Sequence, residues 1–162
     1  MAARFGDREL FDRYLAAIKT ATVRRDRQRL FSALGFFPDP ALVQRAAALY
    51  LSSEFDPRES AAAIYSASGE DPGRQVVWDF VKQNYDAVLA RTPREVTGTI
   101  PELGAGFCDA AHRKDVEDFF RGRIEKLPGG PRVLSQTLET IDLCIASRQA
   151  QEGSVKEFLK NY

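Results

Sequence analysis

The residues with the most versatile chemistry in this chain are a single histidine, His112, and two cysteines, Cys108 and Cys144. Cys108 and His112 are four positions apart, so on a helix they would share a face and could contribute to a metal site or a thiol–imidazole pair. A zinc site needs further ligands, and no residue is identified that would orient the histidine or activate the thiol. We therefore predict a half-buried thiol and a surface imidazole, and we assign no catalytic, cofactor-binding or metal-binding residue.

A second candidate is the glycine-containing stretch from Leu103 to Phe107, with the sequence LGAGF. A phosphate loop or a dinucleotide-binding fingerprint follows a strand, and the fingerprint has a third, spaced glycine; this stretch has neither feature. We predict a packing segment beside a helix. The acidic residues give no firmer assignment, because any two of 23 can be called a pair, so no general acid or base is assigned.

The densest basic run contains Arg24, Arg25, Arg27 and Arg29, with Asp26 among them. Forked guanidinium donors of this kind could bind phosphates or the carboxylate of a peptide. A solvated helix face is the simpler interpretation, since Asp26 moderates the charge. The chain has 23 basic and 23 acidic residues, and this zero net charge argues against a dedicated nucleic-acid or membrane-surface binder. We expect neither partner, and the residues that bind substrate are unknown.

The overall composition is that of one globular domain covering residues 1–162. The chain is 44% hydrophobic and 28% charged, and at this length it can bury a core without disulfides or a structural metal. No Ser-, Gly- or Pro-rich linker divides it. Two cysteines are too few for a secreted disulfide scaffold, so we expect both to be reduced. No signal peptide or membrane-spanning run is visible, and we predict a cytoplasmic location.

A repeated dipeptide indicates where helices begin. Aspartate accepts hydrogen bonds from the free amides of a first helical turn, and proline fits the first helical position, where its missing N–H costs nothing. Each Asp-Pro pair therefore predicts a helix start. The pairs are Asp39-Pro40, Asp56-Pro57 and Asp71-Pro72. Glycines are expected at helix ends, where positive φ is tolerated, at Gly35, Gly69 and Gly129-Gly130.

Apolar residues recur at helical spacing along most of the chain, and no clear strand alternation is present. Trp78, Phe80 and Tyr85 could suggest a stacking platform, but at this spacing they are expected to be core aromatics. The predicted fold class is all-α, a superhelical stack of about eight or nine antiparallel helices, as in HEAT- or armadillo-like solenoids. The expected helices lie near 7–21, 25–34, 40–53, 58–67, 73–91, 95–107, 112–126, 132–149 and 153–161.

Several segments together resemble one protein family. They are RLFSALG at 29–35, DPAL at 39–42, LSSE at 51–54, GRQVVWDFVKQNYD at 73–86, FF at 119–120 and Gln136-x-x-Glu139-x-Ile141. Their order and spacing resemble the C-terminal helical domain of the zinc aminopeptidases related to aminopeptidase N and the endoplasmic-reticulum aminopeptidases. The strongest match is the pattern Trp-x-Phe-x-x-x-Asn-Trp/Tyr, seen here from Trp78 to Tyr85. The resemblance extends from about Phe5 to the end of the chain.

The resemblance implies a role but no active site. The catalytic domain of that family carries an H-E-x-x-H zinc motif, a downstream glutamate ligand and a G-x-M-E-N segment, none of which occurs here. The chain is thus expected to be a non-catalytic C-terminal fragment of a larger aminopeptidase whose zinc lies in the catalytic domain. In the family this part forms a helical stack that walls a chamber and limits peptide access. The implied partners are the parent's catalytic domain and its peptide substrate.

One alternative of a different class is a self-standing helical-repeat module that binds a partner protein through its concave face. Both hypotheses predict the same fold. They differ in the gene, because the aminopeptidase hypothesis requires a longer reading frame that encodes the zinc motif.

Overall fold

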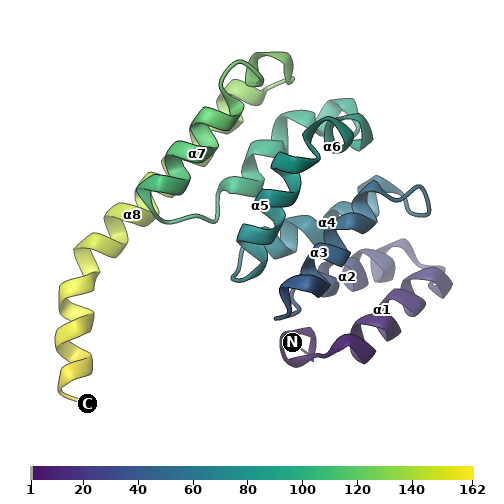
Figure 1. Ribbon diagram of the computed structural model, residues 1–162, viewed down its shortest axis with the longest axis horizontal. Coiled ribbons are helices and arrows are strands. Elements are labelled where there is room, and N and C mark those ends of the chain that lie inside the picture. Colours follow the sequence, from purple (N-terminus) through teal and green to yellow (C-terminus); the bar gives the residue numbers. More distant parts are fainter. Residues whose placement is uncertain (1) are drawn as a thin grey trace.

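The computed structural model describes residues 2–162, and over that range the chain is helical, with no strand. This confirms the predicted all-α fold class (Figure 1). The α-helices are α1 (Arg8–Thr20), α2 (Arg24–Leu34), α3 (Pro40–Ala48), α4 (Pro57–Ser68), α5 (Gly73–Gln83), α6 (Tyr85–Arg91), α7 (Ala110–Phe120) and α8 (Gly130–Lys160). The 3₁₀-helices are η1 (Ala2–Phe5), η2 (Leu49–Leu51), η3 (Arg94–Gly104) and η4 (Ile124–Lys126).

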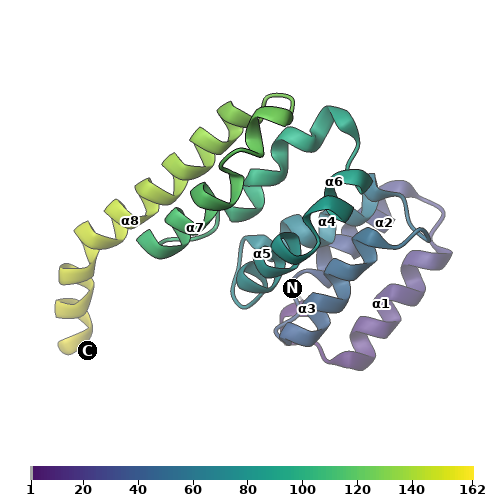
Figure 2. The same ribbon diagram turned by 45° about the horizontal axis from the view of Figure 1, so that its top comes forward.

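Four elements form one layer that runs the length of the molecule. Helix α2 packs along α4, α4 meets η3, and η3 packs along α8. We call these four elements the continuous layer. The other main helices pack onto it as the first arms of helical hairpins: α1 on α2, α3 on α4, α5 on α4 and η3, and α7 on α8. Figures 1 and 2 both show α7 and α8 side by side, with the last part of α8 extending beyond α7 toward the C-terminus.

Aspartate caps the starts of four of the eight α-helices, α1, α3, α4 and α7. The Asp39 side chain accepts a hydrogen bond from the Ala41 amide at 2.8 Å, and Asp56 does the same for Arg58 at 2.8 Å, each with proline at the start of the helix. Both predicted starts are confirmed. The third predicted start, Asp71-Pro72, gives the position of α5 but not its capping. The helix begins at Gly73, Pro72 occupies the N-cap position, and no side chain accepts a hydrogen bond from the first turn.

Two predicted helices have different boundaries. The predicted helix 73–91 is broken at Asn84, whose backbone leaves the helical region and whose side-chain amide donates to the Phe80 carbonyl at 2.8 Å. Such local side-chain bonds compete with the helical ladder, which explains the break. The predicted helix 112–126 ends at Phe120, and a separate 3₁₀ turn, η4, follows.

Two further segments differ in helix type or continuity. The segment predicted as a helix over 95–107 is the 3₁₀-helix η3, with Pro101 inside it. Proline lacks the N–H that an α-helix would use there. The predicted helices 132–149 and 153–161 are one helix, α8, which continues through Gly153. A single glycine costs about 1 kcal/mol in a helix, which is too little to force an end.

The glycine predictions are confirmed only in part. Gly129, just before α8, has φ +72°, the left-handed conformation expected of it. Gly35 and Gly69 end α2 and α4, as predicted, but their φ values of −74° and −80° show that neither adopts the positive φ expected there. Gly35 serves another purpose, since a Cβ at this position would collide with the Ala63 carbonyl oxygen of α4. Its absence lets α2 and α4 pack closely.

The two cysteines are bonded to each other, so the prediction that both are reduced is wrong. Cys108 lies in the loop before α7 and Cys144 on α8, 36 residues later, and the packing of α8 brings them together. The expectation of a cytoplasmic location rested in part on reduced thiols, and it loses that part of its support. Within residues 2–162, no helix is both long and apolar enough to cross a membrane.

The predicted core aromatics are confirmed. Trp78 is fully buried, Phe80 is buried, and Tyr85 packs against the same cluster from α6. This cluster joins α3, α4 and α5 to η3, α7 and α8. A second cluster, centred on Phe11 and Phe31, joins α1 to α2, α3 and α4.

Gly98 is expected to tolerate no side chain. A Cβ at Gly98 would collide with the Pro128 carbonyl oxygen, which belongs to backbone and cannot rotate away. Gly98→Ala should therefore lower the free energy of unfolding by about 3 kcal/mol, measured by urea denaturation. Gly153→Ala is the matched control, because nothing lies within 4 Å of a Cβ there, and it should stabilise by about 0.5–1 kcal/mol. Equal stability of the two variants would contradict this explanation.

Candidate functional site

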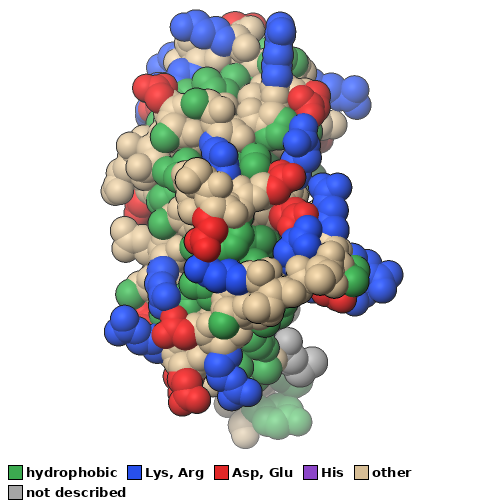
Figure 3. Space-filling model, turned by 90° about the vertical axis from the view of Figure 1, so that its right-hand side faces the viewer, with side chains coloured by type: hydrophobic (Ala, Val, Ile, Leu, Met, Phe, Trp, Pro, Cys, Tyr) green, Lys and Arg blue, Asp and Glu red, His purple; other side chains and the backbone are tan. Residues whose placement is uncertain are grey.

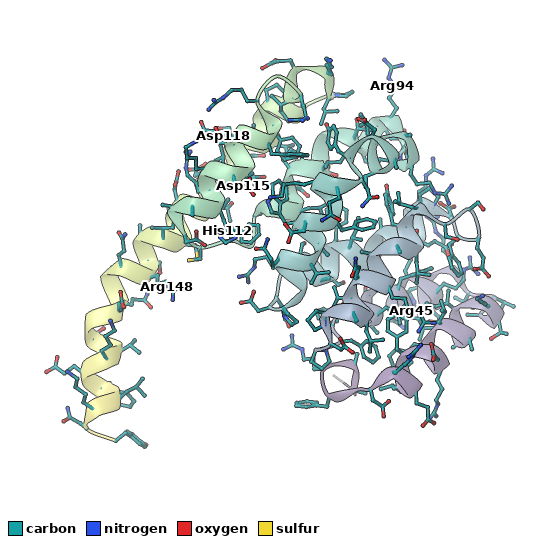
Figure 4. All side chains as sticks on the ribbon, in the orientation of Figure 1. Arg45, Arg94, His112, Asp115, Asp118 and Arg148 are labelled. Carbon is teal, nitrogen blue, oxygen red and sulfur yellow. A yellow bond between two sulfur atoms is a disulfide. The ribbon has the colours of Figure 1, made fainter. Side chains whose placement is uncertain are left out.

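His112 is held between two helices at the start of α7. Its backbone N–H donates to the Asp109 cap at 2.9 Å, and its ring Nδ1 lies 2.6 Å from the other Asp109 carboxylate oxygen. Its Nε2 lies 2.9 Å from the Gln75 side-chain oxygen of α5. The ring also stacks on Phe107 with centroids 4.1 Å apart. Figure 4 labels this partly exposed imidazole, which agrees with the prediction of a surface position near a helix start.

The histidine and the cysteine do not form a reactive pair. Cys108 is in a disulfide, so neither the predicted half-buried thiol nor a thiolate nucleophile exists in this state. Asp109 both caps α7 and contacts the His112 ring, and the hydrogen bond from the His112 amide is the main cause of its lowered pKa. Within residues 2–162, no cluster of three or more His, Cys, Asp or Glu side chains is placed to hold a metal.

The glycine-containing stretch packs as predicted. A Cβ at Gly104 would lie 2.7 Å from a Val116 methyl group, and one at Gly106 would lie 2.5 Å from the Ser68 carbonyl oxygen. The stretch thus allows η3 and the following loop to approach α4 and α7 closely.

The arginine run does not converge on one site. Arg27 donates two hydrogen bonds to Glu59 of α4, from Nε at 2.6 Å and from Nη2 at 2.8 Å. Arg24 lies 3.6 Å from the same carboxylate, whereas Arg29 pairs with Asp26 on its own helix. The prediction of a solvated face therefore describes Arg24 and Arg29, which are exposed, but Arg27 is a bidentate clasp between α2 and α4.

The clasp predicts a dependence of stability on pH. The hydrogen bond from Arg27 is the main cause of the lowered pKa of Glu59, and burial and Asp56 oppose it while Arg24 adds to it. Because the folded-state pKa lies below the ordinary value of 4.5, this contribution is complete above that value and is lost as pH falls through the folded pKa.

Glu59→Gln should accordingly be less stable than the unmodified chain at neutral pH, with the difference shrinking between about pH 5 and about pH 3. Thermal unfolding across this pH range measures the effect. Glu125→Gln replaces an exposed carboxylate and serves as the control. Its unfolding temperature should change with pH in the same way as that of the unmodified chain. A difference for Glu59→Gln that stays constant with pH would rule out the ionised clasp as the cause.

The clearest concave site is an apolar pocket of about 270 Å³ between α4, α6 and η3. Helices α4 and η3 are neighbours in the continuous layer, and residues of both line the pocket. Its apolar walls come mainly from Ile64, Tyr65, Val88, Val96, Ile100 and Leu103. We call it the seam pocket.

The polar groups of the seam pocket are already paired. The Tyr50 hydroxyl lies 2.7 Å from the Thr92 hydroxyl, and the Tyr65 hydroxyl lies 2.8 Å from the Thr99 hydroxyl. Burial raises the pKa of both tyrosines, so both phenols are neutral near pH 7. Apart from Arg58, the pocket therefore presents uncharged walls, mainly of ring and methyl carbons.

Charged side chains at the seam pocket lie at its margin. Arg58 lines the pocket from the first turn of α4, and its guanidinium lies 3.5 Å from the carboxylate of Glu95 on η3. Both side chains are exposed, so this ion pair contributes little to stability. On the face drawn in Figure 3, hydrophobic side chains likewise lie open to solvent between acidic and basic ones.

Sequence reasoning did not find the seam pocket. Its lining comes mainly from one face of α4 and one face of η3, each at helical spacing, but nothing in the sequence indicates that these two faces meet. One local signal is Pro93, which separates α6 from η3. Thr92 and Val96, which line the pocket, therefore lie close to the junction of these two helices. Arg91 secures this junction, since its guanidinium donates to the Ser52 carbonyl at 2.6 Å.

The helical hairpins share one continuous layer, and an apolar pocket opens in that layer. This arrangement is that of a helical-repeat scaffold. The particular family follows from comparison with known proteins. The model of the ERAP1-like C-terminal domain matches residues 1–143, and the chain belongs to this family. The resemblance to the C-terminal domain of aminopeptidases seen in the sequence is thereby confirmed, although the match ends at residue 143 and does not reach the end of the chain.

Curated relatives with similar sequences are aminopeptidases. The chain is 24% identical to Aminopeptidase M1 of Arabidopsis thaliana over 144 residues, covering 87% of the chain and 16% of the relative. It is 24% identical to Aminopeptidase M1-B of Oryza sativa subsp. japonica over 133 residues, covering 81% and 15%. It is 22% identical to mitochondrial Aminopeptidase 2 of Saccharomyces cerevisiae over 142 residues, covering 86% and 15%. The chain thus spans less than a fifth of each relative.

Proposed function

We propose that this chain is the non-catalytic C-terminal domain of a zinc-dependent aminopeptidase, where it walls the substrate chamber and controls the access of peptides. The zinc and the catalytic residues would belong to the parent's catalytic domain, and that domain and the peptide substrate would be its partners. The observation that carries this proposal is the match of residues 1–143 to the ERAP1-like C-terminal domain.

The shape and chemistry of the stack suit such a role. A chamber that accepts many peptides benefits from a broad surface with dispersed contacts rather than one deep, charged site. The continuous layer offers a surface of this kind, built from successive helices, with the neutral seam pocket and the exposed Arg58–Glu95 pair at one point along it.

The natural gene product that contains this chain provides the test. We expect its intact mass to be several times the 18.1 kDa of the chain, and we expect it to hydrolyse an aminoacyl-arylamide in a zinc-dependent manner. Deleting this 162-residue segment from the gene product should change the selectivity for peptide length. The rate of hydrolysis of the aminoacyl-arylamide should change less. The chain alone should give no turnover with added zinc. Robust turnover by the isolated chain would refute the proposal.

A self-standing interaction module is the second candidate, and one feature favours it. Beyond the family match, α8 carries exposed apolar side chains at Val155, Phe158 and Leu159, followed by Tyr162 at the end of the chain. Apolar groups gathered on an exposed helix suit contact with another protein. A natural gene product of about 18 kDa would favour this candidate over the aminopeptidase domain.

A further inference from the structure

We propose that Cys144 is a site of thiol–disulfide exchange, where a small anionic thiol of the glutathione class attacks Sγ and becomes attached to α8. The proposal concerns a covalent modification of the chain and does not depend on its role in an aminopeptidase. It is carried by the unequal exposure of the two bonded cysteines, by the charges that flank them and by the anchoring of the Cys108 loop.

The two halves of the disulfide differ in their access to solvent. Cys144 is exposed on α8, whereas Cys108 is only partly exposed, in the loop between η3 and α7. The residue before Cys108 is Phe107, which is buried and stacks on the His112 ring with centroids 4.1 Å apart. In thiol–disulfide exchange the thiolate must reach one of the two sulfur atoms, so access decides which one reacts. The packing therefore favours attack at Cys144.

The charge beside Cys144 is positive. Arg148 lies four residues further along α8, so it shares a helix face with Cys144, and both residues are exposed. Figure 4 labels this arginine on the part of α8 that extends beyond the start of α7. The carboxylates at positions 142 and 152 of α8 already have cationic partners, in the pairs Arg113–Asp142 and Lys156–Glu152. An anionic thiolate is therefore attracted to this side of the bond.

The charge beside Cys108 is negative. Asp109 follows it directly, and the lowered pKa of this carboxyl group keeps it ionised at neutral pH. A thiolate that approaches Cys108 meets a charge of its own sign. Exposure and charge thus select the same sulfur atom, that of Cys144.

The exchange balances in atoms and electrons. The thiolate sulfur bonds to Cys144 Sγ while the bond between the two cysteines breaks, and its electron pair leaves with Cys108 as a thiolate. The incoming sulfur is oxidised to the level of a disulfide and the Cys108 sulfur is reduced, so no other oxidant is required.

The Cys108 loop is held in place on both sides of the cysteine. A Cβ at Gly106 would lie 2.5 Å from the Ser68 carbonyl oxygen, which shows how closely the loop packs on α4, and Asp109 caps α7. The Cys108 thiolate therefore stays within reach of α8. It can attack Cys144 in turn, expel the added thiol and restore the original bond, which makes the modification reversible.

The test uses the oxidised 162-residue chain with reduced glutathione near neutral pH, quenched at early times with N-ethylmaleimide and mapped by peptide mass spectrometry. Among chains with one adduct, we expect glutathione on Cys144 and maleimide on Cys108 in about tenfold or greater excess over the reverse pattern. Chains with maleimide on both cysteines are fully reduced and are counted separately. In urea, which removes the folded environment, the two patterns should become about equal.

Two results would overturn the proposal. One is an equal yield of the two patterns in the folded chain. The other is a folded chain that forms no adduct under conditions that produce one in urea, because the disulfide would then be closed to exchange.

A charge variant tests the preference for an anionic thiol. Arg148→Ala should slow adduct formation by glutathione about twofold to threefold at low ionic strength, and the effect should disappear in high salt. The reaction with 2-mercaptoethanol, which has no other charged group, should change less. Arg132→Ala removes an exposed arginine near the start of α8 and should leave both rates unchanged. Identical glutathione rates with and without Arg148 would refute the charge selection.

Discussion

Replacing Trp78 by alanine is expected to lower the free energy of unfolding by about 4–5 kcal/mol. Trp78 is fully buried at the junction of α5, η3 and α7, with ring centroids 5.4 Å from Phe119 and 6.3 Å from Phe107. Removing the indole leaves a cavity that three separate elements would have to close. It also removes the N–H that donates to the Asp115 carboxylate at 2.7 Å.

Graded variants separate the loss of volume from the loss of the hydrogen bond. Trp78→Phe keeps an aromatic ring and should cost about 2 kcal/mol, because Lys82 still pairs with Asp115 at 2.6 Å. Tyr162→Ala removes a side chain that is 98% exposed and should change nothing. Urea denaturation measures all three. A Trp78→Ala variant within 1 kcal/mol of the unmodified chain would show that this cluster is not the main core.

Trp78 and the helix starts were predictable because their causes are local. Burial of Trp78 follows from apolar spacing along one helix, and capping by Asp39 and Asp56 depends on amides two residues away. The Asp71-Pro72 pair shows the limit of this reasoning, since the same dipeptide gave the position of a helix without its capping bond. The break at Asn84 had a local cause too, but a polar residue between two apolar stripes does not reveal it.

The features that sequence reasoning missed depend on how helices pack. Arg27 and Glu59 are 32 residues apart, and only the contact of α2 with α4 makes them a pair. The seam pocket likewise is lined by α4, α6 and η3, which only tertiary packing brings together. Functional surfaces of helical stacks are assembled in this way from several repeats, so their residues carry no motif. Apolar spacing predicted the all-α fold and the family resemblance predicted the class of protein, while the candidate site depends on contacts between helices that no sequence pattern shows.

The disulfide was missed for the same reason, and its effect on stability is the second large one expected. The bond closes a loop of 36 residues between Cys108 and Cys144. Restricting the unfolded chain over a loop of this length is worth about 4 kcal/mol on the chain-entropy account. Reduction should therefore lower the free energy of unfolding by about that amount.

The position of the bond on α8 predicts where reduction acts in the folded protein. Ile141 is buried and Ile145 is half-buried against the stack, whereas residues 146–162 are exposed. The disulfide thus lies at the last turn of α8 that contacts the body, where the only noncovalent polar partner from α7 is Arg113, 2.9 Å from Asp142. We expect reduction to increase hydrogen exchange in the turns of α8 around Cys144 and to leave α2 and α4 unchanged.

A double variant provides the control for this prediction. Cys108→Ser with Cys144→Ser should show the stability of the reduced chain, and a phosphine reductant should not lower it further. The unmodified chain should lose about 4 kcal/mol when the same reductant is added. Two thiols titrating in the untreated protein, or equal stability with and without reductant, would contradict the pairing. A reducing compartment would remove this stabilisation. The difference in free energy of unfolding between the oxidised and the reduced chain therefore measures how much stability the protein would lose there.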